Sequence, residues 1–331
     1  MRRLVVTAFT LLGFACALAA ADVSNPPDMT RARNLSPEVT DRDGHLLRAY
    51  LTKDGYWRIK TSVRDVSPRY LALLKAYEDQ RFDDHYGVDP LAMARATAQL
   101  ASNRRIVSGG STLTMQVARL LEPRPRGVVT KLFQMVRAVQ LEERYSKDEI
   151  LSLYLTLAPF GGNLEGVRAA SLSYFGKEPS GIDLAQAALL VALPQSPVKQ
   201  RPDRHAIQAA KGRDKVLTRM VEEGVVTLSD ARVAMKEGVP FARQKMPLAA
   251  PHLSDRLVRH NAGPRIVTTL DGALQGALER LAAQEVAYFD DGATLAVVVV
   301  ENKSRNVVAY VGGTDYWGPA GQIDLANRAR S

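Results

Sequence analysis

The sequence predicts a mainly α-helical domain followed by a smaller segment that mixes helix and strand. Helical periodicity dominates from Ser67 to about Glu223. Two β-rich runs joined by a polar turn then follow within residues 293–313. Because a chain of 331 residues is too long for one compact core, we expect more than one folded unit.

The composition is that of an ordinary globular protein with an excess of positive charge. Hydrophobic residues make up 46% and charged residues 24%, and 44 Lys and Arg against 35 Asp and Glu give a net charge of +9. This excess favours an anionic partner, such as nucleic acid, a phosphate-bearing substrate or an anionic membrane surface. The single cysteine, Cys16, lies in the N-terminal segment, so the rest of the chain has no disulfide or thiol chemistry.

The N-terminus predicts export. Arg2 and Arg3 precede an uncharged run from Leu4 to Ala21, which is at the lower limit of length for a bilayer span. Small residues near its end are also compatible with cleavage of a signal peptide. We favour an uncleaved anchor over residues 1–21, with the two arginines cytoplasmic and the remainder exported.

Changes in composition predict the boundaries of the segments. Residues 22–60 combine a polar, proline-bearing stretch with two Asp-Gly pairs, which indicates a tether and a small hairpin. We expect the helical domain at 61–224, a linker at 225–265 and a second unit at 266–331.

Glu78 is the leading candidate for acid–base chemistry. Ser67 and Pro68 predict the start of a helix, with the serine as its cap. The expected apolar neighbours of Glu78 on one face of this helix are Leu71, Leu74 and Phe82. A carboxylate among apolar side chains loses hydration and becomes suited to proton transfer. The alternative on this stretch alone is a surface glutamate paired with Lys75 or Arg81.

A second stretch, "SGGSTLTMQVARLL" (108–121), predicts a helix that begins after small residues. The exposed N–H groups of such a helix start can bind an oxyanion or a sugar oxygen, although many ordinary helix caps look the same. Thr112, Gln116 and Arg119 cluster beside its apolar stripe, which is formed by Leu113, Val117, Leu120 and Leu121.

A third stretch supplies cations. Arg124, Arg126 and Lys131 follow closely, and Gln134 shares a helical face with Lys131. The sequence "SKDE" (146–149) then forms a capping box that starts the next helix. A cationic group after a carboxylate and a hydroxyl-rich helix start suggests a phosphate leaving group, whereas each arginine by itself is more simply a solvated cation.

In this order the stretches resemble the glycosyltransferase domain of class-A penicillin-binding proteins, glycosyltransferase family 51, and most closely the 1C type. The first family motif, Glu-Asp-x-x-Phe-x-x-His-x-Gly, is matched by Glu78, Asp79, Phe82, His85 and Gly87. The second motif, Gly-x-Ser-Thr-x-Thr-x-Gln, is matched by Gly109, Ser111, Thr112, Thr114 and Gln116. Two later blocks, "YSKDEILSLYL" and "KGRDKVLTRM", also match the family.

The third family motif, Arg-Lys-x-x-Glu, is altered in this chain. Thr130 replaces the arginine and Gln134 replaces the glutamate, while Lys131 is retained. The neutral Gln134 puts in doubt any role that needs a second negative charge, such as holding a divalent cation at a diphosphate. We therefore expect no required cofactor and no metal ligands, and the resemblance leaves Mg²⁺ or Mn²⁺ open.

The resemblance implies a lysozyme-like fold and a peptidoglycan glycosyltransferase that polymerises lipid II with inversion and releases undecaprenyl diphosphate. Glu78 would be the general base. The implied substrate-binding residues are Asp79, Phe82, His85, Ser111, Thr112, Gln116, Arg119, Arg126, Lys131 and Gln134. His85 is expected to fix the loop after the catalytic helix rather than to transfer a proton.

The same resemblance implies a location and a set of partners. We expect the domain on the periplasmic face of the inner membrane, with lipid II, the growing glycan strand, the membrane and other cell-wall synthesis proteins as partners. Three alternatives remain open: a lysozyme-like glycan-cleaving enzyme, a non-catalytic cell-wall scaffold, and a nucleic-acid-binding protein. The last rests on charge alone and is opposed by the export signal.

The stretches "TTLD" and "AVVVVENKSRNVVAYVGG" resemble the opening of a penicillin-binding transpeptidase domain. Residues 224–331 contain no serine followed three positions later by lysine, the Ser-x-x-Lys motif of that domain. We therefore expect residues 266–331 to be its truncated N-terminal part, in a fragment or a truncated gene product. Neither transpeptidase activity nor covalent penicillin binding is expected of this chain.

Overall fold

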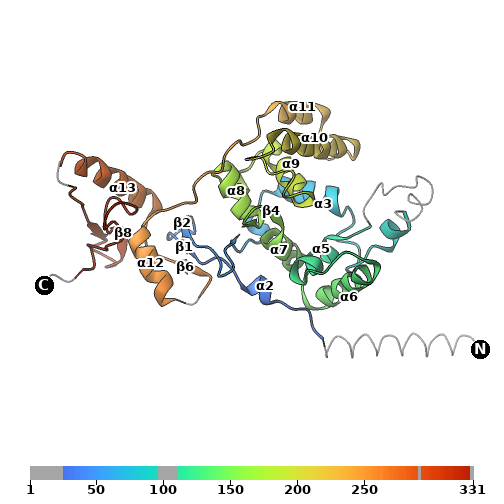
Figure 1. Ribbon diagram of the computed structural model, residues 1–331, viewed down its shortest axis with the longest axis horizontal. Coiled ribbons are helices and arrows are strands. Elements are labelled where there is room, and N and C mark those ends of the chain that lie inside the picture. Colours follow the sequence, from blue (N-terminus) through green and yellow to red (C-terminus); the bar gives the residue numbers. More distant parts are fainter. Residues whose placement is uncertain (1–24, 96–109, 262, 290–291, 329–331) are drawn as a thin grey trace, which may run out of the picture.

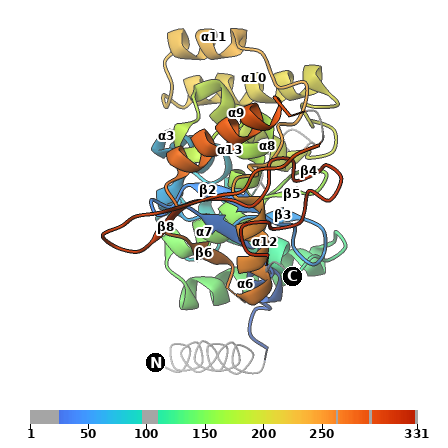
Figure 2. The same ribbon diagram turned by 90° about the vertical axis from the view of Figure 1, so that its left-hand side faces the viewer.

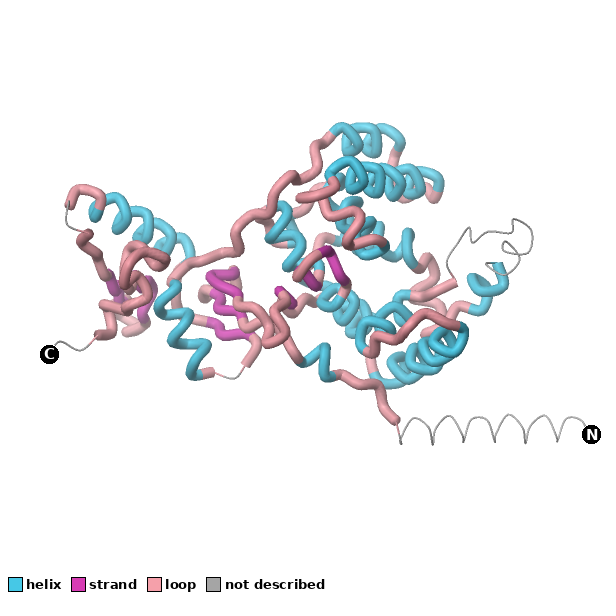
Figure 3. The backbone as a smooth tube through the Cα atoms, viewed as in Figure 1, coloured by secondary structure: helices cyan, strands magenta, loops and turns pink. Residues whose placement is uncertain are grey.

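A computed structural model describes residues 25–95, 110–261, 263–289 and 292–328. Figure 1 shows a large helical lobe and a smaller C-terminal segment, with the sheet of β1, β2 and β6 between them. Helices predominate and strands are few and short (Figure 3), which confirms the predicted fold class. The predicted anchor over residues 1–21 lies outside the described residues, and among those that are described no helix is long and apolar enough to cross a bilayer.

The helices of the lobe have the following bounds: α2 (Thr30–Arg33), α3 (Pro68–Glu78), α5 (Leu113–Leu121), α6 (Val128–Arg144), α7 (Lys147–Leu157), α8 (Val167–Phe175), α9 (Leu184–Ala192), α10 (Ala206–Glu222) and α11 (Leu228–Lys236). A further helix begins at residue 90 and is described as far as residue 95. Short 3-10 helices lie at η1 (Val63–Asp65), η2 (Pro179–Gly181) and η3 (Leu193–Gln195).

Helix α9 forms the centre of this lobe. Its sequence, LAQAALLVA, is apolar on nearly every side, and only Leu184 and Gln186 are not buried. A helix of this kind must be surrounded by other elements, and α9 packs against α3, α8, α10 and α11. Figure 2 shows α10 and α11 at the end of the lobe opposite α6. Since η3 continues directly from α9, this packing also holds Gln195 at the edge of the lobe.

Helices α5, α6 and α7 form the other half of the lobe. The predicted apolar stripe of α5 is buried against α6 and α7. The predicted capping box of α7 is also present, with Ser146 accepting from the backbone N–H of Glu149 and the Glu149 carboxylate accepting from the N–H of Ser146. Periodicity and capping therefore predicted these helices correctly.

The end of α3 differs from the prediction. The helix stops at Glu78, because Asp79 leaves the helical conformation at φ −160°. Phe82 therefore lies in the following turn, where its N–H donates to the Asp79 carbonyl, and it is not on the helical face of Glu78. Ser67 occupies the cap position, but its side chain makes no capping hydrogen bond.

The strands divide the first part of the chain between two sheets. β1 (Glu38–Thr40) pairs antiparallel with β2 (Leu46–Ala49) and parallel with β6 (Arg265–Val267). β3 (Trp57–Arg58) instead pairs with β5 (Leu164–Glu165), which also pairs with β4 (Pro159–Gly161). The hairpin predicted within residues 22–60 thus forms around its first Asp-Gly pair, and β6 joins it to the C-terminal segment.

The C-terminal segment contains α12 (Pro251–His260), α13 (Gly272–Val286) and an antiparallel pair, β7 (Val297–Val300) with β8 (Val307–Val311). The residues predicted as a linker, 225–265, include α11, which packs on α9 and α10, and α12. On β7, Val298 and Val300 remain 43% and 50% exposed. β7 therefore leaves one face exposed, whereas β8 buries three consecutive residues, Ala309, Tyr310 and Val311.

A buried ion-pair network joins the lobe to the central sheet. Glu38 on β1 is 1% exposed and accepts from Arg168 of α8 and Arg265 of β6, each at 2.6 Å. Arg168 also donates to Glu178 at 2.7 Å. Buried charges are tolerated when each is paired and hydrogen-bonded, so the position of β1 relative to α8 depends on these contacts.

We predict that Arg168→Ala strongly destabilises the protein. It would leave the buried Glu38 carboxylate without its α8 partner, a change that costs about 3–5 kcal/mol. The matched control is Arg232→Ala on the exposed surface of α11, which should change the free energy of unfolding by less than about 0.5 kcal/mol. Chemical denaturation of both variants is the measurement, and equal stability of the two would contradict a structural role for the network.

Candidate active site

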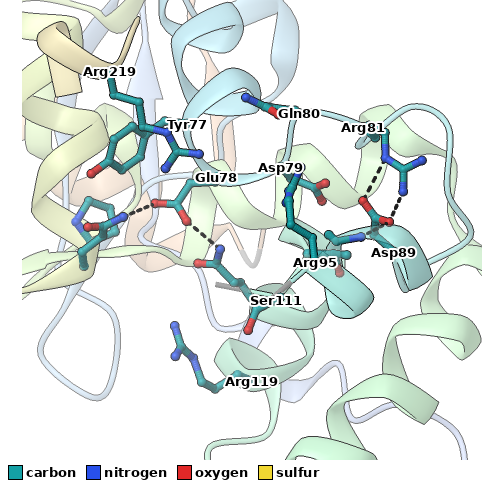
Figure 4. Close-up of a pocket in the computed structure, with 16 residues that line it drawn as sticks. Tyr77, Glu78, Asp79, Gln80, Arg81, Asp89, Arg95, Ser111, Arg119 and Arg219 are labelled. Atoms are coloured by element: carbon teal, nitrogen blue, oxygen red, sulfur yellow. Dashed lines mark hydrogen bonds and ion pairs between the residues drawn. The ribbon is translucent and has the colours of Figure 1, made fainter. Parts of the chain in front are cut away.

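A cleft lies where the end of α3 faces the start of α5, η3 and α10 (Figure 4). Its volume is about 320 Å³. Its lining is mostly polar and consists of Tyr77, Glu78, Asp79, Gln80, Arg81, Asp89, Ala92, Arg95, Gly110, Ser111, Thr112, Gln116, Arg119, Pro194, Gln195 and Arg219.

Glu78 lies at the centre of this cleft, half-buried and held by two neutral amides. Gln116 Nε2 donates to Oε2 at 2.9 Å, and Gln195 Nε2 donates to Oε1 at 3.0 Å. The alternative pairings do not form: Lys75 binds Asp83 at 2.9 Å and Arg81 Nε donates to Asp89 at 3.1 Å. Among the described residues, no cation lies within ion-pair distance of the Glu78 carboxylate.

The groups beneath Glu78 are aromatic and neutral. Tyr70 of α3 and Tyr154 of α7 are fully buried, and their hydroxyls have no hydrogen-bond partner among the described residues. Burial raises the pKa of each hydroxyl, and the nearby Glu78 charge adds to the effect. Both hydroxyls therefore stay neutral, and the inner side of Glu78 is poorly solvated.

Asp79 connects the end of α3 to the start of α5. Its Oδ2 accepts from the Leu113 N–H at 2.8 Å, and its two oxygens lie 3.0–3.1 Å from His85 Nε2. The N–H of Met115 is taken by the Thr112 hydroxyl at 3.1 Å. The prediction that this helix start offers free N–H groups to an oxyanion is therefore wrong for Leu113 and Met115, because the protein's own side chains occupy them.

Gly87 explains the last position of the first motif. Its carbonyl accepts from the Thr112 hydroxyl at 2.6 Å, and its φ of +78° is one that other residues rarely adopt. A Cβ at this position would lie 2.7 Å from the backbone of Ala138 on α6. Glycine thus allows the loop after α3 to lie directly against α6 and to support the start of α5.

Phe82 and His85 support this loop and do not line the cleft. Phe82 is 1% exposed and packs edge-on against the His85 ring at 6.3 Å. Lys147 of α7 lies over the Phe82 ring at 4.6 Å and donates to the His85 carbonyl at 2.6 Å. This arrangement agrees with the structural role expected for His85, and it offers no route for Phe82 to touch a ligand in the cleft.

Two cations lie on the α5 and α6 side of the cleft without a carboxylate partner among the described residues. Lys131 donates to the Ser111 hydroxyl, and Arg119 is exposed at the cleft wall (Figure 4). Burial, together with the nearby charge of Arg119, lowers the pKa of Lys131. Adjacent like charges without counter-ions form a site suited to an anion.

Some of the predicted substrate-binding residues line the cleft and others do not. The cleft lining includes five of them: Asp79, Ser111, Thr112, Gln116 and Arg119. Lys131 reaches the lining through Ser111. Arg126 is exposed and Gln134 is half-buried one turn beyond Lys131 on α6, and neither belongs to the cleft lining. Gly109 of the second motif lies outside the described residues.

Gln195 and Arg219 are cleft residues that the sequence analysis missed. Gln195 holds Glu78, and Arg219 of α10 lies 4.9 Å from the Tyr77 ring. Arg219 falls within the later family block "KGRDKVLTRM" (211–220), so that block contained a usable signal. Gln195 stands 117 positions from Glu78 and follows a buried helix that carries no charged residue, so its role was not visible from local pattern.

The carboxylates near Glu78 do not form a metal site. Asp79 is committed to His85 and Leu113, and Asp89 is committed to Arg81. Within the described ranges, the only cluster with the geometry of metal ligands is formed by Asp41, Asp43 and His45, in the first hairpin. The donor set of the cleft therefore does not fit a divalent cation held by protein carboxylates.

The fold is mainly helical, and its cleft contains a carboxylate, Glu78, that has no cationic partner among the described residues. A model of the transglycosylase family matches residues 43–221, more than half of the chain. The chain therefore belongs to the transglycosylase family. This membership confirms the enzyme class predicted from the sequence.

Known proteins similar to this chain are penicillin-binding proteins. Penicillin-binding protein 1C of Escherichia coli K12 is 42% identical over 295 residues, which cover 88% of this chain and 38% of that protein. Penicillin-binding protein 1A of Aquifex aeolicus is 36% identical, with coverages of 61% and 28%. A crystal structure of penicillin-binding protein 1A from Haemophilus influenzae aligns with a TM-score of 0.36 and 18% identity, covering 81% of this chain and 32% of that one. The chain thus spans about a third of the length of these relatives.

Proposed function

We propose that this chain is a peptidoglycan glycosyltransferase that polymerises lipid II. The observation that carries the proposal is that one region of the lobe holds both an amide-bound carboxylate, Glu78, and two cations, Arg119 and Lys131, that have no carboxylate partner among the described residues. A sugar transfer from a diphosphate donor needs one base and one anion site, and the positions of Glu78 and of the two cations support these two roles.

Glu78 acts as the general base in this proposal. It removes the proton from the 4-hydroxyl of the acceptor sugar as that oxygen forms a bond to the anomeric carbon of the donor. The bond from the anomeric carbon to the diphosphate oxygen breaks on the opposite face, so the configuration inverts. Each Glu78 oxygen accepts one amide hydrogen bond and keeps a further lone pair for the transferred proton.

Lys131 and Arg119 stabilise the leaving diphosphate, whose negative charge grows as the bond breaks. The Ser111 hydroxyl, which is bound to Lys131, would orient the same group. A diphosphate departs without protonation, so no general acid is needed. Undecaprenyl diphosphate is the product that follows from a lipid II donor.

The cleft gives less support to a glycan-cleaving enzyme. Glycosidases use two carboxyl groups, one of them a free acid, whereas the other carboxylates of this cleft, Asp79 and Asp89, are committed to His85 and Arg81. A non-catalytic scaffold would have no need for a Glu78 carboxylate that lacks a cationic partner and is held by two amide groups. Nucleic acid is also disfavoured, because the cleft contains the Glu78 carboxylate, which would repel a phosphate backbone.

A polyprenyl substrate stays in the bilayer, so the proposal includes a site near the membrane surface. The uncharged run at residues 4–21 supports an inner-membrane anchor with the catalytic domain on the periplasmic face. The proposed partners are lipid II, the growing strand, the membrane and other cell-wall synthesis proteins.

Glu78→Gln should abolish polymerisation of labelled lipid II while preserving the fold. The substitution keeps the size of the side chain and removes its basicity, which lowers turnover by about 10²-fold or more. Glu143→Gln on the exposed face of α6 is the matched control and should polymerise normally. Near-normal turnover by folded Glu78→Gln would rule out the proposed base, and shortening of finished glycan by the parent chain would rule out synthesis.

Lys131→Arg should extend activity to higher pH. The lowered pKa of Lys131 means that the parent loses this cation, and with it turnover, at a lower pH than an ordinary lysine allows. Arginine stays charged throughout this range, so the alkaline limb of the pH–rate profile should move upward. Lys215→Arg, on the exposed face of α10, should leave the profile unchanged. An alkaline limb that is identical in Lys131→Arg and the parent would contradict this role of Lys131.

Removal of divalent cations should lower activity only slightly, by less than about 2-fold, because a neutral amide at Gln134 is a poor ligand for Mg²⁺ or Mn²⁺. The matched variant is Gln134→Glu, which restores a carboxylate one turn beyond Lys131 and should increase the dependence on metal. Polymerisation is measured with and without EDTA. Complete loss of parent activity in EDTA, with recovery only on adding metal, would contradict the prediction.

A further inference from the structure

Gln195 is the cleft residue with the most distant origin in the sequence. It is the last residue of η3, and the buried helix α9 leads directly into that turn. Its Nε2 lies 3.0 Å from Glu78 Oε1 and opposes Gln116, whose Nε2 lies 2.9 Å from Oε2. The two amides thus hydrogen-bond to the Glu78 carboxylate from different halves of the lobe: Gln195 from η3, which follows α9, and Gln116 from α5.

We propose that Gln195 is a positioning residue that, together with Gln116, holds the Glu78 carboxylate in the orientation needed to receive the acceptor proton. The inference rests on the proposed function, because it assigns Gln195 a part in the same step. Gln195 touches Glu78 and does not react itself, so its effect passes through that carboxylate.

Neutral donors suit this task better than cations do. A carboxylate needs hydrogen bonds to fix its rotation, since side-chain freedom lowers the fraction of productive geometries. An arginine or lysine in the position of Gln195 would also fix it, but the positive charge would stabilise the ionised form and weaken the base. The amide of Gln195 orients Glu78 and, because it is neutral, weakens the base less than a cation would.

The other charged and titratable groups near Glu78 are distributed over the elements that surround it. They are Tyr70 and Tyr77 on α3, Asp79, Arg81 and Asp89 in the loop that follows, Arg95, Arg119 on α5, Tyr154 on α7 and Arg219 on α10. Among the described residues, none of these groups forms a hydrogen bond or ion pair with the Glu78 carboxylate. The two amides are therefore its direct contacts, and a change at Gln195 acts on Glu78 at hydrogen-bond distance.

Three substitutions test the inference in the full chain. Gln195→Ala removes the donor, the nearly isosteric Gln195→Glu introduces a negative charge, and Gln195→Lys introduces a positive one. The same three substitutions at Gln208, an exposed residue of α10, are the matched controls. Thermal unfolding of every variant identifies any that fail to fold.

The readouts are kcat, KM and the acid limb of the pH–rate profile for lipid II polymerisation. Gln195→Ala should lower kcat about 10-fold with little change in KM, the scale of one hydrogen bond to a charged group. Gln195→Glu should move the midpoint of the acid limb upward by about one pH unit, and Gln195→Lys should move it downward by a similar amount. The Gln208 variants should match the parent.

The inference would be overturned if the three Gln195 variants matched the Gln208 controls. It would also be overturned if all three lost kcat equally with an unmoved acid limb, which is the behaviour of a residue that only supports the fold.

A readout without turnover separates this inference from the proposed function. The ¹³C signal of the Glu78 carboxylate, assigned by its absence in Glu78→Gln, can be followed through a pH titration of the parent and of Gln195→Glu. If the Glu78 signal titrates differently in the parent and in Gln195→Glu, but the parent does not polymerise lipid II, then the contact between Gln195 and Glu78 is supported and the proposed function is rejected. Identical titration curves would reject the contact.

Discussion

The cleft depends on the carboxylate of Asp79. This carboxylate accepts a hydrogen bond from the backbone N–H of Leu113 and contacts His85 Nε2. These contacts fix the start of α5 against the residue at which α3 ends. That junction brings Glu78, the last residue of α3, opposite Gln116 on the second turn of α5. In the loop after α3, Phe82 and His85 are buried, and Gly87 lies against the backbone of α6. The position of Glu78 therefore follows from the packing of the lobe.

Electrostatics divides the cleft into two parts with different chemistry. The direct contacts of the Glu78 carboxylate are two neutral amides, and the buried neutral hydroxyls of Tyr70 and Tyr154 lie beneath it. The cations Arg119 and Lys131 lie on the α5–α6 side and have no carboxylate partner among the described residues. The proposed displacement of diphosphate by a sugar hydroxyl is served by this separation of the carboxylate from the cations, since a cation beside the base would weaken it.

Local pattern predicted the helices and much of the cleft, and long-range contacts account for what it missed. Capping at Ser146 and the periodicity of α5 were correct because both act within a few residues. The extension of the α3 face to Phe82 was wrong, because Asp79 takes a tertiary contact and breaks the helix there. The same contact fills the helix start expected to hold an anion. Gln195 is brought to Glu78 only by the packing of α9, which no local pattern contains.

The most direct test is the affinity of Glu78→Gln for lipid II, measured by equilibrium binding under conditions where the parent does not turn over. A general base contributes in the transition state and little in the ground state, and the amides of Gln116 and Gln195 face a side chain of unchanged size. Binding equal to that of the parent, within about threefold, is the predicted result. Loss of binding in proportion to loss of turnover would show that Glu78 holds the substrate and that the base lies elsewhere.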